Sequence, residues 1–200
     1  MERAPEVGED RVLTIPNLLS LGRLVCVPIF LYLLFHHPIH RVSAAWLLAG
    51  LGATDWVDGF VARRFGQVST LGKVLDPTAD RILLFVGVIA ILIDGAVPTW
   101  VATVAIVREG IVAAAAVVLA AMGARRIDVQ WAGKAGTLAL MFAFPLFLAS
   151  HAPDLFWHTE ARVLAWLFAI PGLALSLYAA AMYVPIARNA LVEGRVGSNT

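Results

Sequence analysis

Eight residues between positions 55 and 80 have types and a spacing suited to binding metal ions and phosphate. The string is D-x2-D-G-x2-A-R-x8-G-x3-D-x3-D, and its fixed positions are Asp55, Asp58, Gly59, Ala62, Arg63, Gly72, Asp76 and Asp80. It lies among apolar segments, where a carboxylate is costly and usually functional. Four neighbouring carboxylates repel one another unless a positive partner lies between them, and a pair of hard divalent cations is the obvious candidate.

The spacing within each half of this motif predicts two helices that present their acids to one site. Asp55 and Asp58 are three residues apart, and Asp76 and Asp80 are four apart, so each pair shares one face of a helix. Two helices that meet there would direct four carboxylates into one pocket. The alternative is a set of paired charges at helix ends that serves only the packing of a membrane bundle.

The other fixed positions suit a phosphate ligand that lies close to the backbone. Gly59 and Ala62 are small, so a bulky ligand or a second backbone could approach closely. Arg63 carries the planar guanidinium group that pairs well with phosphate oxygens. We expect Gly72 to break the chain between the two helical pieces.

The composition is that of a membrane protein. The chain has 200 residues, of which 60% are hydrophobic and 14% charged, whereas soluble domains carry roughly 25% charged residues. The formal net charge is +1, and there is no basic arm and no basic–aromatic interleaving, so we expect no nucleic-acid partner. The length fits one helical bundle without a sizeable soluble domain.

Six apolar runs predict an all-α polytopic membrane protein with six transmembrane helices, because one span needs about 20 residues. The runs cover residues 17–35, 43–63, 75–93, 98–122, 133–150 and 162–188. The second run ends with the first half of the motif, and the third run begins with the second half. We therefore expect a cytoplasmic or interfacial segment at 1–16, a membrane domain at 17–188 and a cytoplasmic tail at 189–200.

The basic residues predict the orientation of this bundle. Ten of the 15 Lys and Arg residues fall in the N-terminal segment, the second and fourth connections and the C-terminal tail. Only Arg41 and Arg162 fall on the opposite side. Cytoplasmic loops of membrane proteins are enriched in such residues. We expect both termini and the acidic motif on the cytoplasmic side of the plasma membrane.

At every fixed position, the motif resembles the signature of the CDP-alcohol phosphatidyltransferases. The resemblance extends over nearly the whole chain and is moderate outside the motif. It implies that a hydroxyl attacks CDP-diacylglycerol at its β-phosphorus, which yields a phosphodiester-linked lipid and CMP. It also implies Mg²⁺ as the metal, with Mn²⁺ as an alternative, contact with membrane lipids, and a homodimer.

The same resemblance implies a role for each matching position. The metal ligands would be Asp55, Asp58, Asp76 and Asp80. Asp80 would also act as the general base that takes the proton of the acceptor hydroxyl. The pocket for CDP-diacylglycerol would be lined by Asp55, Asp58, Gly59, Ala62, Arg63 and Gly72.

Three cationic residues outside the motif are candidates for binding the acceptor. Arg108, next to Glu109 in the fourth span, either faces the cytoplasmic cavity and binds the acceptor or pairs within the bundle. Lys134, in the segment Gly-Lys-Ala-Gly-Thr, either holds an acceptor phosphate or anchors the helix at the cytoplasmic edge. Arg23 in the first span either faces the same cavity or extends to the membrane interface.

The motif leaves the acceptor alcohol open, but its surroundings favour a glycerol-type acceptor. The segment Leu13-Thr-Ile-Pro-Asn-Leu-Leu-Ser resembles the branch that contains phosphatidylglycerophosphate synthases and cardiolipin synthases. The former tend to carry more basic residues after the Arg-Glu pair, and a second lysine where Gly136 stands here. Because a phosphomonoester needs several cationic donors, we favour phosphatidylglycerol over glycerol 3-phosphate as the acceptor, with an inositol phosphate as the third alternative.

A hypothesis from another class is a non-catalytic membrane transporter or scaffold that retains a lipid-nucleotide site. The intact Asp80 argues against a protein that only binds, because such a protein could lose its base and keep the site. A transporter is expected to repeat charged or broken helices in both halves, and the second half of this chain has no counterpart of the acidic cluster.

Overall fold

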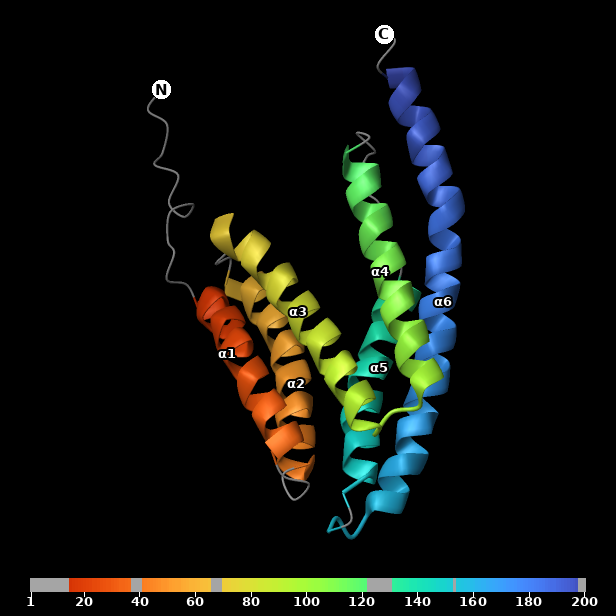
Figure 1. Ribbon diagram of the computed structural model, residues 1–200. Coiled ribbons are helices and arrows are strands. Elements are labelled where there is room, and N and C mark those ends of the chain that lie inside the picture. The colour runs from red at the N-terminus through yellow and green to blue at the C-terminus, as the bar shows by residue number, and fades with distance from the viewer. Residues whose placement is uncertain (1–14, 37–40, 66–69, 122–130, 153, 198–200) are drawn as a thin grey trace, which may run out of the picture.

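The computed structural model of the protein is all-helical over the residues that it describes (Figure 1). These residues are 15–36, 41–65, 70–121, 131–152 and 154–197. The helices are α1 (Ile15–His36), α2 (Arg41–Phe65), α3 (Thr70–Asp94), α4 (Thr99–Ala121), α5 (Trp131–Ser150) and α6 (His158–Gly197). Their side chains are described except at 15–17, 19, 55–65, 70–78, 80, 116, 119–121 and 183–197.

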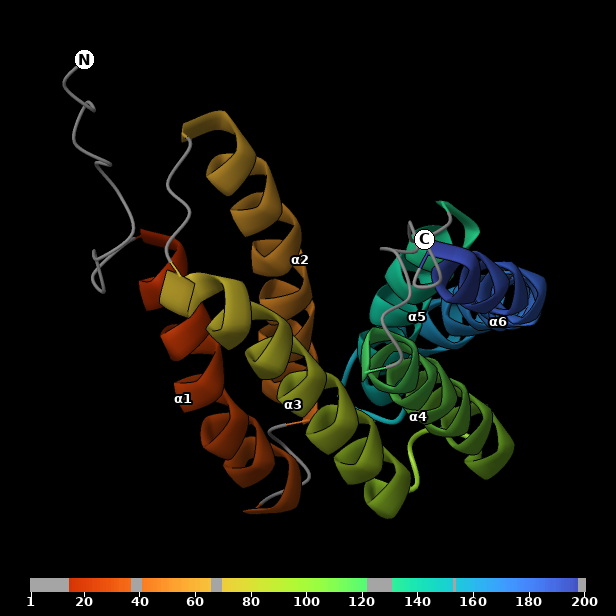
Figure 2. The same ribbon diagram turned by 90° about the horizontal axis from the view of Figure 1, so that it is seen from above.

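The helices run up and down in two groups of three. One group contains α1, α2 and α3, and the other contains α4, α5 and α6 (Figure 2). α2 ends and α3 begins at the upper end of the bundle in Figure 1, and we call this the motif end. We call the opposite end, where α2 begins at Arg41 and α3 ends at Asp94, the distal end.

Small residues bring α6 close to its neighbours. The buried positions Ala161, Ala165, Ala169 and Gly172 recur along one face of α6, and small side chains allow helix backbones in membranes to approach closely. The aromatic ring of Trp166 stacks on that of Trp100 in α4 and meets Phe147 of α5 edge-on, with centroid distances of 5.8 and 5.2 Å. Trp166 thereby links all three helices of the second group.

A tight turn ends α3 and fixes the place of its last residue, Asp94. The amide of Gly95 donates to the carbonyl of Leu92 at 3.1 Å, and that of Ala96 donates to the carbonyl of Ile91 at 3.3 Å. This pair of bonds defines a Schellman motif. Gly95 has a φ of +78°, which glycine adopts without steric cost. Ala96 and Ile91 are both buried, so the turn is anchored in the core.

The all-α prediction is confirmed, whereas the six membrane crossings stay a prediction. By length and composition, two described segments are able to cross a membrane, Trp131–Ser150 and His158–Met182. The described part of α1 includes a shorter apolar helix, Ser20–His36. Large apolar side chains on α6, including Val163, Leu167 and Ile170, are exposed on the bundle surface, as expected of a helix that faces lipid.

One local prediction needs correction. Gly72 lies within the first turn of α3, so the prediction that it breaks the chain is wrong. The N–H groups of a first helical turn have no partner within the helix, so a glycine removes little from it at this place. α6 continues to Gly197, past residue 188, where the predicted membrane span ends; a helix can extend beyond the apolar run that crosses the membrane, so the end of the span stays a prediction.

Candidate active site

The two halves of the acidic motif belong to helix segments at the same end of the bundle. α2 contains Asp55 and Asp58 in its last turns, and α3 contains Asp76 and Asp80 in its first turns (Figure 1). The side chains of all eight motif positions lie outside the described part of the structure. The helical setting of the motif is therefore confirmed, and the carboxylate cluster and the nucleotide pocket stay predictions.

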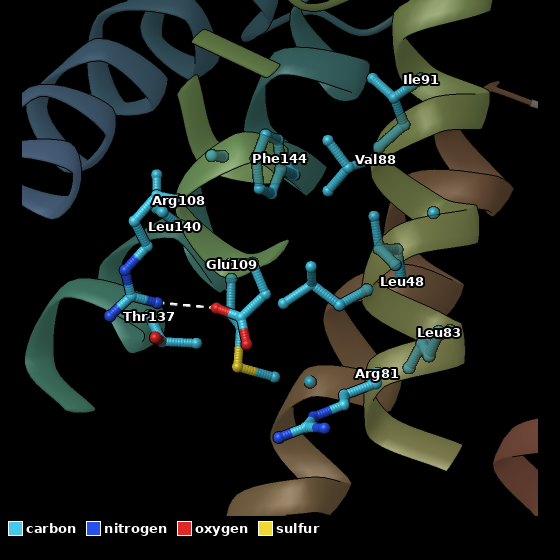
Figure 3. A pocket seen from close by; sticks show the side chains of 15 residues that line it. Leu48, Arg81, Leu83, Val88, Ile91, Arg108, Glu109, Thr137, Leu140 and Phe144 are labelled. Atoms are coloured by element: carbon cyan, nitrogen blue, oxygen red, sulfur yellow. Dashed lines mark hydrogen bonds and ion pairs between the residues drawn. The ribbon is translucent and has the colours of Figure 1, made fainter. Parts of the chain in front are cut away.

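A cavity of about 240 Å³ lies between α2, α3, α4 and α5 (Figure 3). Its walls are mainly apolar, with Leu48, Val88, Ile91, Leu140 and Phe144 among them. Its polar lining consists of Arg81, Arg108, Glu109 and Thr137. Figure 3 shows the charged groups toward one end and Val88 and Ile91 toward the other.

The polar end of this cavity adjoins the motif. On α3 the lining extends from Arg81 to Ile91, and ten residues of α-helix span about 15 Å. Arg81 directly follows Asp80 in the sequence, whereas Ile91 is three residues from the distal end of α3. The cavity therefore begins beside the backbone of Asp80 and becomes apolar toward the distal end.

Arg108 lines the cavity but is not a free cation. Its side chain is 9% exposed, and its Nη1 donates to Oε2 of Glu109 at 2.7 Å. Its Nε donates to the backbone oxygen of Ser176 in α6 at 3.3 Å. Glu109 thus offsets the charge of Arg108 at the cavity wall. Arg108 both lines the cavity and pairs within the bundle, and its binding of the acceptor stays a prediction.

α5 and α6 cross at Gly136, where there is no room for a side chain. A Cβ atom on Gly136 would lie 2.7 Å from the backbone nitrogen of Ser176 and 2.9 Å from the backbone oxygen of Gly172. A lysine at this position would require α6 to move away from α5. Such a movement would also strain the hydrogen bond from Arg108 to Ser176. The close packing of α5 on α6 is therefore incompatible with a lysine at position 136.

Sequence reasoning did not single out two cavity residues on α5, Thr137 and Met141. Thr137 donates from Oγ1 to the backbone oxygen of Gly133 at 3.0 Å. Met141 fills the space beside Gly52 of α2, where a Cβ atom would lie 3.3 Å from the Met141 Cε. The positions Thr137, Met141 and Phe144 follow the i, i+4, i+7 spacing of one helix face, and this signal could have identified the lining.

The two remaining acceptor candidates lie away from the cavity lining. Lys134 is exposed on the first turn of α5. Arg23 is 2% exposed within α1, so the alternative in which it extends to the membrane interface is wrong. Packing of α1 against its neighbours, which a single helix cannot reveal, encloses this side chain.

Metal binding rests on the motif alone. Among the side chains that the structure describes, no group of three or more His, Cys, Asp or Glu residues could hold a metal ion. The four predicted aspartate ligands are outside that set. The two-metal site accordingly stays a prediction.

Comparison with known proteins identifies a family for this sequence. The sequence profile of the CDP-alcohol phosphatidyltransferases matches residues 13–184. A cardiolipin synthase (CMP-forming) of Streptomyces coelicolor is 39% identical over 183 residues, which cover 89% of this chain and 84% of the relative. A putative cardiolipin synthase of Mycobacterium tuberculosis is 33% identical over 179 residues, covering 90% and 85%. A CDP-diacylglycerol–glycerol-3-phosphate 3-phosphatidyltransferase of Escherichia coli is 32% identical over 186 residues, covering 90% and 97%.

Proposed function

This chain belongs to the CDP-alcohol phosphatidyltransferase family, and we propose that it transfers the phosphatidyl group of CDP-diacylglycerol to phosphatidylglycerol. A hydroxyl oxygen of the glycerol headgroup forms a bond to the phosphorus that carries the diacylglycerol. The bond between this phosphorus and the oxygen of the departing CMP breaks, and the hydroxyl proton passes to a base. The products are cardiolipin and CMP.

The pairing of Arg108 with Glu109 is the observation that carries the choice of acceptor. Glycerol 3-phosphate brings a phosphomonoester with up to two negative charges, which calls for several cationic donors. Phosphatidylglycerol brings a phosphodiester with one negative charge. At this cavity Arg108 is offset by Glu109 at 2.7 Å, and the crossing at Gly136 leaves no space for a further lysine. This charge balance favours the phosphodiester.

The shape of the cavity supports a lipid acceptor. A headgroup at the polar end would lie beside Asp80, while the apolar walls toward Ile91 suit an acyl chain. The helix faces of α2 and α3 that line the cavity also carry the motif aspartates, as the residue spacing along each helix indicates. Asp55 follows Gly52 by three residues and Leu48 by seven, and Asp80 precedes Leu84 by four and Gly87 by seven.

The donor set of the motif fits hard divalent cations. Carboxylate oxygens are the ligands that Mg²⁺ takes in proteins, and the fold carries both pairs of aspartates at one end of the bundle. When bound at Asp55, Asp58, Asp76 and Asp80, two such ions would neutralise negative charge on the diphosphate.

The side chains of the protein would position the reactants and move the proton. Asp80 would accept the proton of the attacking hydroxyl, which requires that the hydroxyl reach it within hydrogen-bond distance. Arg63 would pair with the diphosphate of CDP-diacylglycerol. The Arg108–Glu109 pair would orient the acceptor headgroup, with Arg108 donating to the phosphodiester and Glu109 accepting from a glycerol hydroxyl.

Glycerol 3-phosphate is the second candidate acceptor. Arg81 also lines the polar end of the cavity and is exposed, so two guanidinium groups could contact one phosphate. The similarity to the Escherichia coli relative favours the same alternative.

An acceptor panel tests the proposal. Purified protein in detergent receives labelled CDP-diacylglycerol and Mg²⁺ together with phosphatidylglycerol, glycerol 3-phosphate or inositol phosphate, each offered separately, and the lipid product and released CMP are measured. We expect cardiolipin from phosphatidylglycerol alone. Phosphatidylglycerophosphate from glycerol 3-phosphate would contradict the acceptor assignment and leave the family reaction in place. A reaction without added acceptor controls for hydrolysis of CDP-diacylglycerol.

We also propose that all six helices cross the plasma membrane, with the motif end in the cytoplasm. The distribution of basic residues supports this orientation, and so do the exposed apolar side chains along the helices. A homodimer, which the family resemblance implies, is expected within the same membrane.

A further inference from the structure

At the distal end of the bundle, opposite the motif, one arginine joins three helices. Arg41, the first residue of α2, donates from Nη2 to Oδ1 of Asp94, the last residue of α3, at 2.9 Å. Its Nη1 donates to the backbone oxygen of His151, directly after the end of α5, at 3.3 Å. The side chain of Asp94 is 8% exposed and that of Arg41 is 25% exposed, so the pair is largely shielded.

Both charges lie at helix ends that do not favour them. The helix dipole is positive at an N-terminus and negative at a C-terminus, and it therefore disfavours a cation at the start of α2 and an anion at the end of α3. The presence of Arg41 and of Asp94 at these positions is therefore not explained by a stabilising effect on their own helices. The contact between them, and the bond from Arg41 to a carbonyl at the end of α5, account for both.

The pair is better suited to selecting one arrangement of helices than to adding stability. Nε of Arg41 and Oδ2 of Asp94 are buried without a hydrogen-bond partner in the described part of the structure. A shielded ion pair with incomplete hydrogen bonding adds little stability compared with apolar residues of similar size. Its charges nevertheless penalise any arrangement in which they separate, so it can fix the register of two helices.

The Arg41–Asp94 pair lies at equal helical distances from the two halves of the motif. Positions 41 to 55 and positions 80 to 94 each span 14 residues, and each span corresponds to about 21 Å of helix. Joining α2 and α3 at this pair therefore brings Asp55 and Asp80 to the same height in the bundle. A slip by one helical turn, about 5.4 Å, would separate the two halves. The turn at Gly95 holds Asp94 in place independently.

We propose that the Arg41–Asp94 pair is a positioning device that holds α2 and α3 in the register at which the two halves of the acidic motif form one site. This inference rests on the proposed function, because it concerns the same four aspartates. Arg41 and Asp94 lie at the distal end and act only through the helices, so they are positioning residues and not catalytic ones.

A distance measurement and kinetics together test the inference. The variants are Asp94→Asn, Arg41→Gln and the double variant, with Arg162→Gln as the control. Arg162 is the other basic residue expected on this side of the membrane and is exposed on α6. Spin labels are attached at Ala53 of α2 and Ile82 of α3 after replacement of the single cysteine, Cys26, by serine. Both label sites are exposed, and each is 12 residues from the pair along its helix.

In the native pairing we expect one narrow distance distribution between the labels. Each single variant should shift or broaden this distribution. The double variant should change it no more than Arg41→Gln does, because the two changes remove one interaction. The control Arg162→Gln should leave the distribution unchanged. In the variants whose label distance changes, kcat should fall about tenfold to a hundredfold, because small misplacements of catalytic groups lower the rate by such factors. The KM for the acceptor should change little. The charge-swapped variant Arg41→Asp/Asp94→Arg should move both readouts back toward the native values, because it restores the ion pair but not the bond to the His151 carbonyl, which an aspartate cannot donate.

An unchanged label distance in Asp94→Asn and Arg41→Gln would overturn the inference, whatever happens to activity. Labels at Leu138 of α5 and Leu177 of α6 separate a register change from general unfolding, because both sites are exposed and away from the pair. A change at this second label pair in the single variants would also count against it. If no acceptor yields product, the proposed function fails while the distance measurement still decides the role of the pair.

Discussion

At the scale of single residues, the charge balance at the cavity supports the proposed choice of acceptor. Arg108 reaches the cavity with one nitrogen bonded to Glu109 and another bonded to the backbone of Ser176. Three cationic donors would suit a phosphomonoester, but the cavity lining contains two, Arg81 and Arg108. Lys134 is exposed away from the lining, and Gly136 leaves no space for a side chain. The acceptor specificity should therefore depend on Glu109 as much as on Arg108.

The variant Glu109→Gln should shift the enzyme toward glycerol 3-phosphate. Loss of the carboxylate leaves the charge of Arg108 uncompensated, so a doubly charged phosphate is bound more favourably. We expect the ratio of kcat/KM for glycerol 3-phosphate to that for phosphatidylglycerol to rise about tenfold. This factor corresponds to the contribution of about one charge-assisted hydrogen bond. Arg108→Gln should raise the acceptor KM while the KM for CDP-diacylglycerol changes little. A larger effect of Arg108→Gln on the donor would place this residue in the nucleotide pocket.

The variant Asp80→Asn should bind CDP-diacylglycerol and lose turnover. An amide cannot accept the hydroxyl proton, and loss of a general base typically lowers kcat by about 10²–10⁴. Equilibrium binding of CDP-diacylglycerol in the presence of Mg²⁺, measured beside kcat, separates the two effects. Asp55→Asn is the matched comparison, because loss of a metal ligand should weaken donor binding as well. Turnover near that of the native enzyme in Asp80→Asn would exclude this residue as the base.

At the scale of helices, close backbone contact between α5 and α6 supports the cavity wall. Gly136 and Gly172 face each other at the crossing, and a Cβ on Gly172 would lie 3.2 Å from the backbone oxygen of Gly136. The same crossing brings the Ser176 carbonyl to Arg108. The position of Arg108 at the cavity therefore depends on how closely α6 packs on α5.

The variant Gly136→Ala should destabilise the protein by about 1–3 kcal/mol, the usual cost of adding a methyl group to a filled contact. Gly50→Ala is the matched control, because a Cβ at Gly50 on α2 meets nothing within 4 Å. Alanine is favoured over glycine in a helix interior, so this control should be neutral or slightly stabilising. Thermal unfolding in detergent compares the two variants. Equal Tm values would mean that α6 can move away from α5 without cost.

At the scale of the whole molecule, the two ends of the bundle carry different groups of residues. The motif end carries the four aspartates and the polar end of the cavity. The distal end carries the Arg41–Asp94 pair, the Gly95 turn and the aromatic contacts of Trp100 and Trp166. On the proposals above, chemistry would take place at one end, and the register of α2 and α3 would be set at the other.

A reporter fused after Thr200 should read cytoplasmic. α6 ends at the motif end (Figure 1), and the nucleotide-activated substrate is expected in the cytoplasm. A second fusion at the connection between α5 and α6, which lies at the distal end, should read external and serves as the matched control. An external signal from the C-terminal fusion would place the aspartates on the wrong side of the membrane.

Much of the molecule could be predicted from local patterns. The six apolar runs predicted the helices because the length and hydrophobicity of a helix are local properties. The spacing of Asp55, Asp58, Asp76 and Asp80 predicted their helical setting for the same reason. Gly72 was misassigned because the preference of glycine for chain breaks does not distinguish a break from the first turn of the following helix.

The sequence by itself thus determined the family and the helical composition of the fold, and it predicts the chemistry of the motif. Only the tertiary structure decided that Glu109 and Ser176 hold Arg108, that Gly136 marks a helix crossing, and that Arg41 meets Asp94. Arg108 and Ser176 are 68 residues apart, Arg41 and Asp94 are 53 apart, and Arg41 and His151 are 110 apart. Such contacts depend on which helix faces pack together, and the pattern along any one helix does not specify its neighbour.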